Sequence, residues 1–82
     1  MIVRKLCKAT QRLRSRFGGD VQCHVLSSRF GIVFLTDFVH IVVARNGYVV
    51  GYVVGDELVS MSQRALLRDA VYDLERLFCS MN

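Results

Sequence analysis

Two apolar runs flank the pair Asn46-Gly47 within residues 39–54, VHIVVARNGYVVGYVV. β-Branched and aromatic residues favour strands, and Asn-Gly favours a two-residue hairpin turn in which both turn residues have positive φ. We therefore expect a hairpin that pairs Val43 with Val50. Because side chains alternate across a strand, this register also fixes which side chains share a face.

Two further turns extend the hairpin toward the N-terminus. Ser27-Ser28 and Thr36-Asp37 have the composition of tight turns. As two-residue turns, they would pair Ile32 with Cys23 on one side and with Ile41 on the other. Together the three turns predict a four-stranded antiparallel meander in the order 1-2-3-4, with strands over residues 20–26, 29–36, 38–45 and 48–55.

Helical spacing replaces the strand pattern at both ends of the chain. Apolar side chains recur on one face of residues 2–17, and Gly18-Gly19 follows as a stop signal. Ser60 and Gln63 have capping-box spacing before a long apolar stripe, which predicts a second helix over residues 61–80. The expected fold class is α+β, a single domain over residues 1–82 in which two amphipathic helices flank four strands.

The two faces of the predicted sheet differ in bulk. We expect the bulkier face to pack against both helices. The second face is flatter but still largely apolar, where an antiparallel sheet would normally turn polar side chains to water. We expect this second face to form a homodimer or to bind a partner; its residues are Val33, Leu35, Phe38, His40, Val42, Val49 and Val53. The alternative is a monomer with one helix on each face.

The formal charge of +4 is unevenly distributed, because residues 1–16 hold six of the eleven basic residues and no acid. Five of the six share one face of the predicted first helix: Arg4, Lys5, Lys8, Arg12 and Arg16. Such a face suits phosphates, an anionic membrane surface or an acidic protein. No aromatic residue interleaves with the cations, so nucleic-acid binding would be unspecific in sequence. The alternative is a solvated outer face of a core helix.

Catalytic motifs are missing from the sequence. It has no hydrolase elbow, phosphate loop, metal box or cofactor fingerprint. His24 and His40 are expected on one face of the sheet, about 9–10 Å apart with a strand between them, which is too far for a shared metal. We therefore expect no enzymatic activity, no cofactor, no metal and no small-molecule substrate.

The three cysteines are an odd number without a CxxC pair, which predicts neither a disulfide framework nor a zinc site. A reducing, cytoplasmic compartment is expected. The most apolar stretch contains Thr36, Asp37 and His40, so we expect strands and not a membrane span. The sequence favours a small non-enzymatic binding protein of the inhibitor or adaptor type that docks onto another protein. The alternatives are a nucleic-acid-binding protein using the basic helix and, third, a peripheral membrane protein.

Overall fold

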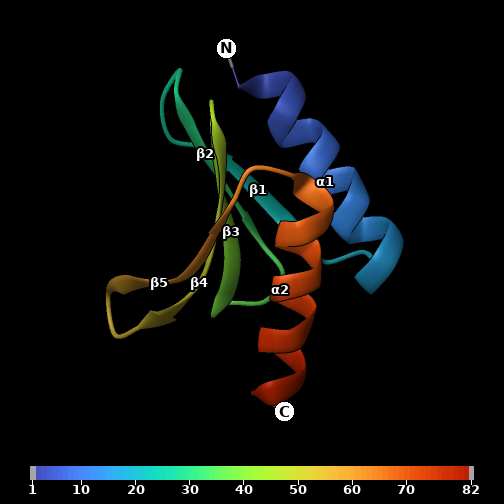
Figure 1. Ribbon diagram of the computed structural model, residues 1–82, viewed down its shortest axis with the longest axis vertical. Coiled ribbons are helices and arrows are strands. Elements are labelled where there is room, and N and C mark those ends of the chain that lie inside the picture. Colours follow the sequence, from blue (N-terminus) through green and yellow to red (C-terminus); the bar gives the residue numbers. More distant parts are fainter. Residues whose placement is uncertain (1, 82) are drawn as a thin grey trace.

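The computed structural model describes residues 2–81. Both helices lie on the same side of one twisted sheet (Figure 1). The elements in chain order are α1 (Val3–Phe17), β1 (Gln22–Val25), β2 (Phe30–Phe34), β3 (Val39–Ala44), β4 (Gly47–Val54), β5 (Glu57–Arg64) and α2 (Leu67–Ser80).

The sheet is an antiparallel meander of five strands in the order β1-β2-β3-β4-β5. The α+β class, the single domain, the strand order and the first helix are confirmed. The prediction of four strands is wrong, because Glu57–Arg64 is a strand and the second helix begins only at Leu67.

Backbone pairing explains the fifth strand. Gly55 has φ +62°, which suits the first position of a two-residue hairpin turn that pairs Val54 with Glu57. Without β5, the long strand β4 would leave a row of backbone N–H and C=O groups unpaired along one edge. Ser60 and Gln63 therefore lie in a strand and cap no helix.

Hydroxyl side chains lengthen the first two loops and change the register. Ser27 Oγ accepts hydrogen bonds from the backbone N–H of Arg29 and Phe30, and Thr36 Oγ1 accepts from those of Phe38 and Val39. The backbone N–H groups of Leu26 and Leu35 donate to the carbonyl oxygens of Phe30 and Val39, so each loop has three residues between these positions where two were predicted. The pairing of β2 with β1 and its pairing with β3 each shift by one residue. The side chains of β2 therefore lie on the opposite face from the one predicted, whereas β1 and β3 keep their predicted faces.

The turn before β4 also differs from the prediction. Ala44 pairs with Gly47, so Arg45-Asn46 forms the turn, and neither residue has positive φ. Gly47 belongs to β4, where a Cβ would lie 2.9 Å from the carbonyl oxygen of Arg64. The register shifts by two, which pairs Val43 with Tyr48 and leaves the predicted faces of β3 and β4 unchanged.

The main core lies between the sheet and the two helices. Leu6 and Leu13 of α1 and Leu74 of α2 are almost fully buried and share one cluster with side chains from the middle strands. The strand residues of the cluster are Val33, Val39, Ile41, Val43, Tyr48 and Val50. Because residues of α1 and α2 share this cluster, both helices cover one face of the sheet and leave the other open.

Gly51 allows a close approach between the backbones of β4 and β5. A Cβ at this position would lie 2.1 Å from the carbonyl oxygen of Val59, next to a bulge in the pairing of β4 with β5. We predict that Gly51→Ala lowers the free energy of unfolding by about 1–3 kcal/mol, since a backbone oxygen cannot move aside as a side chain can. Urea denaturation measures the change.

Gly19→Ala is the matched control for this prediction. A Cβ at Gly19 meets no atom within 4 Å. The control is expected to change stability by less than about 0.5 kcal/mol. Equal stability of the two variants would show that the approach at Gly51 is not a constraint.

Candidate docking surfaces and polar cluster

The five cations predicted on one helix face divide into two groups in the structure. Lys5 and Arg16 are bound to other parts of the protein, as described below. Arg4, Lys8 and Arg12 are exposed and have neither a hydrogen bond nor an ion pair with any residue in the range 2–81. The extended basic surface is therefore narrower than the sequence pattern indicates.

Lys5 ties α1 to the end of β3. Its Nζ donates hydrogen bonds to the carbonyl oxygens of Ala44 at 2.5 Å and Arg45 at 3.2 Å. The ammonium group also lies 4.4 Å from the ring centroid of Tyr48. Burial lowers the pKa of Lys5. These contacts use the ammonium hydrogens for the fold, so Lys5 has little capacity left for a ligand.

Arg16 ties the two helices together. Its Nε donates to the Glu75 carboxylate at 3.0 Å, and Nη2 donates to the same oxygen. Nearby, the rings of Phe17 and Phe78 meet edge to face with centroids 6.1 Å apart. Arg16 therefore has a partner that a phosphate ligand would have to displace.

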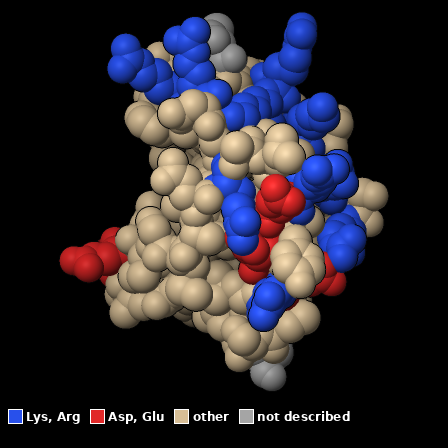
Figure 2. All heavy atoms as spheres, in the orientation of Figure 1, with Lys and Arg blue, Asp and Glu red and all other residues tan. Residues whose placement is uncertain are grey.

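The face of the sheet away from the helices carries no charged residue. We call this the open face, and register and alternation place fifteen residues on it. They are Gln22, His24, Phe30, Ile32, Phe34, His40, Val42, Ala44, Gly47, Val49, Gly51, Val53, Leu58, Ser60 and Gln63. Figure 2 shows basic side chains at the top, basic and acidic ones together on the helix side, and acidic ones at the tip of the β4–β5 hairpin, with an uncharged surface over the strands between the top and that tip.

The prediction is wrong for two residues of the docking face. Val33 and Leu35 lie on the helix side, where Val33 is completely buried, because the longer loops turn β2 over. His40, Val42, Val49 and Val53 lie on the open face as predicted, and Phe38 is exposed in the β2–β3 loop.

Large side chains missed by the sequence analysis take the place of Val33 and Leu35. Phe30 and Phe34 of β2 and Leu58 of β5 lie on the open face. Phe30 and Leu58 are 48% and 52% exposed. The signal that could have placed Phe30 and Phe34 is the hydroxyl residue at the start of each loop.

A buried histidine lies at the centre of the open face. His40 is opposite Gly51, where a Cβ would lie 3.3 Å from Nε2, so glycine leaves room for the imidazole. The Phe34 ring lies between two histidines, with its centroid 5.6 Å from His40 and 5.8 Å from His24. Burial lowers the pKa of His40, while a backbone hydrogen bond involving Phe38 acts in the opposite direction. The two histidines thus contact a phenyl ring and do not converge on a metal position.

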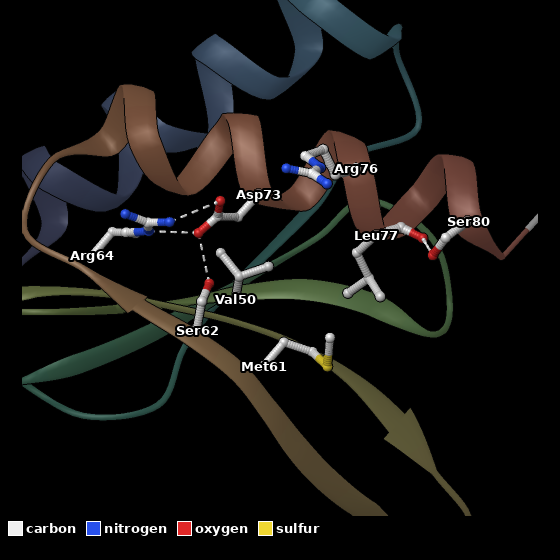
Figure 3. Close-up of a pocket in the computed structure, with 8 residues that line it drawn as sticks. All are labelled: Val50, Met61, Ser62, Arg64, Asp73, Arg76, Leu77 and Ser80. Atoms are coloured by element: carbon white, nitrogen blue, oxygen red, sulfur yellow. Dashed lines mark hydrogen bonds and ion pairs between the residues drawn. The ribbon is translucent and has the colours of Figure 1, made fainter.

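A polar cluster connects β5 to α2 beside a cavity of about 360 Å³ (Figure 3). Asp73 accepts hydrogen bonds from Ser62 Oγ at 2.8 Å and from Arg64 Nε at 2.6 Å. The Arg64 guanidinium lowers the pKa of Asp73, and burial opposes it. A carboxylate with a lowered pKa is a weak proton acceptor, so this pair does not activate Ser62 as a nucleophile. We call Ser62, Arg64 and Asp73 the clip, because their hydrogen bonds hold β5 against α2.

The chain finds no match among known protein families, curated proteins or solved structures. Between residues 2 and 81, no helix combines the length and the apolar character needed to cross a membrane. The same residues contain no group of three or more His, Cys, Asp or Glu side chains arranged to hold a metal ion.

We predict that the clip makes stability depend on acid pH. The folded pKa of Asp73 lies below its ordinary value of 3.8, so its stabilising effect is complete well above pH 3.8 and is lost as the pH falls through the lower folded pKa. Chemical denaturation of the wild type between pH 7 and pH 2 is expected to show this loss, and Asp73→Asn is expected to reduce it. The control is Asp56→Asn, at the exposed tip of the β4–β5 hairpin. An unchanged profile for Asp73→Asn contradicts the assignment.

Proposed function

We propose that this chain is a small non-enzymatic binding protein that acts by docking its open face onto another protein, as an inhibitor or adaptor does. The observation that carries the proposal is the placement of both helices on one side of the sheet. The other side is left uncharged and largely apolar, with Phe30 and Leu58 half exposed.

The size of the open face supports docking. Five strands spaced about 4.8 Å apart and about five residues of 3.3 Å each give a footprint of roughly 400 Å². Ten of the fifteen residues are apolar, so roughly 270 Å² of apolar surface is buried on each of two partners, a gross gain of about 13 kcal/mol at about 25 cal/mol per Å². Association costs about 4–15 kcal/mol. The gain lies within the upper part of this range of costs, which fits a reversible complex.

The partner that fits this surface most simply is a second copy of the chain. In a two-fold dimer the same patch meets itself, so any charge on the patch would face a like charge. The open face has no Lys, Arg, Asp or Glu, and Gly47 and Gly51 lower its profile along β4. A different protein could use the same face, in which case the dimer is a resting state.

We predict that the protein is a dimer at micromolar concentration and that Leu58→Asp makes it a monomer. Leu58 is 52% exposed, so the substitution adds a charge to the interface with little effect on the core. Light scattering is expected to give twice 9.3 kDa for the wild type and 9.3 kDa for the variant.

Val3→Asp is the control, because Val3 is 40% exposed on the helix side. The control is expected to remain dimeric, and circular dichroism checks that both variants are folded. A wild-type mass of 9.3 kDa at high micromolar concentration would rule out the homodimer.

A second candidate function is nucleic-acid binding through α1. It is favoured by the three exposed, unpaired cations Arg4, Lys8 and Arg12. Each phosphate neutralised on duplex DNA contributes about −0.9 to the slope of log K against log salt, so three contacts predict a slope near −2.7.

The double variant Lys8→Glu/Arg12→Glu is expected to abolish DNA binding and to leave the melting temperature nearly unchanged, since both residues are exposed. Fluorescence anisotropy with a labelled duplex measures both affinity and slope. The absence of binding to DNA and RNA at low salt eliminates this candidate and leaves docking through the open face unaffected.

A further inference from the structure

A second cavity, of about 520 Å³, lies between α1 and the start of α2. Its lining brings together cations from both helices. Lys8 and Arg12 come from α1 and Arg68 comes from the first turn of α2, and Tyr48 of β4 also lines it. The other lining residues are Ala65, Leu66 and Leu67.

Tyr48 has a buried ring and a hydroxyl group for which the described part of the fold provides no partner. The residue is only 6% exposed, yet its hydroxyl has no hydrogen-bond partner among residues 2–81. Among these residues, the only polar side-chain atom that is sealed from solvent without a partner is Nδ1 of His40. The Tyr48 hydroxyl therefore still reaches solvent, and Tyr48 is one of the residues that line this cavity. Burial raises the pKa of Tyr48, so the hydroxyl keeps its proton and can donate it to an acceptor.

The start of α2 adds further donors. Leu66 precedes the helix in an extended conformation and supplies no side-chain cap. The first backbone N–H groups of a helix have no partner within the helix, and they attract anions. Leu67 and Arg68, whose N–H groups belong to this first turn, line the cavity.

Few acidic groups oppose an anion here. Asp69 is the acidic residue in the first turn of α2, and its Oδ1 lies 4.0 Å from Nε of Arg68, at the limit of an ion pair. Lys8 and Arg12 have no acidic partner in the described part of the chain. Of the three lining cations, only Arg68 has a carboxylate neighbour in the described part of the chain, and that contact is weak.

We propose that this cavity binds the phosphate group of a small phosphorylated molecule. Lys8, Arg12 and Arg68 would neutralise the dianion, and the Tyr48 hydroxyl and the first N–H groups of α2 would donate hydrogen bonds to its oxygens. A single phosphate fits better than a nucleic-acid backbone, because Arg68 of a second helix lines the same cavity as Lys8 and Arg12 of α1. Leu66, which is 49% exposed at the rim, offers an apolar contact to an organic substituent.

The test is a titration of the full-length protein with inorganic phosphate and with phenyl phosphate, followed by amide chemical shifts at constant ionic strength. Both probes are expected to shift the amides of Leu67, Arg68 and Asp69 and the resonances of Tyr48. Tighter binding of phenyl phosphate identifies an organic phosphate as the ligand class, and equal binding identifies free phosphate.

Matched variants separate a built site from general attraction to a basic helix. Arg12→Gln and Arg68→Gln are each expected to weaken phosphate binding about tenfold, as for a hydrogen bond to a charged group. Arg4→Gln removes the same charge from α1 outside the cavity and is expected to change affinity less than about twofold.

Tyr48→Phe tests the hydroxyl itself. It keeps the ring under the Lys5 ammonium and removes only the oxygen, so a weakening of several-fold at an unchanged melting temperature is expected. If this variant does not fold, the comparison of Arg68→Gln with Arg4→Gln decides the question.

Two results overturn the proposal: no localised shifts with either probe, or an equal loss for Arg4→Gln and Arg12→Gln. Binding of an oligonucleotide that lacks a terminal phosphate, without any response to the two probes, would also overturn it. Such binding would assign α1 to nucleic acid.

Discussion

The close approach of β5 to β4 at Gly51 determines how the second helix is placed. The bulge between Val50 and Gly51 inserts one extra residue into β5. Without this residue, alternation would point Ser62 and Arg64 to the open face. With it, both point toward α2, where they bind Asp73. The hydrogen bonds to Asp73 therefore depend on a bulge that lies beside a backbone contact that only glycine permits.

The basic residues of α1 have two roles: some bind other elements of the fold, and others are exposed on the surface. Lys5 closes the end of β3 by binding two carbonyl oxygens, and Arg16 holds the Glu75 carboxylate of α2. A helix with a solvated basic face would keep all its cations free. In this protein Lys5 and Arg16 bind neighbouring elements, whereas Arg4, Lys8 and Arg12 are exposed and free to bind a ligand. Since exposed ion pairs contribute little stability, the Arg16–Glu75 pair matters mainly for how the two helices are oriented.

Much of the fold follows from local patterns, and the errors come from contacts that are not local. Helical spacing and the Gly18 stop define α1, and alternation defines the meander. The β5 strand has a weak pattern of its own, and pairing with β4 overrides the helical interpretation. The inverted β2 results from Ser27 and Thr36, whose hydroxyls lengthen the loops by one residue each. About half of the residues on the open face were predicted, because β2 was assigned to the wrong face and β5 was not expected to be a strand.

The candidate sites show the same limit. The basic residues of α1 are evident in the sequence, but the cavity requires Arg68 and Tyr48, which the fold brings from two other elements. Alternation along β4 then separates the two proposed activities. Tyr48 points to the helix side and its neighbour Val49 to the open face. A phosphate ligand and a docked protein would therefore occupy opposite sides of the sheet. They do not compete for space, and β4 contributes a residue to each of the two surfaces.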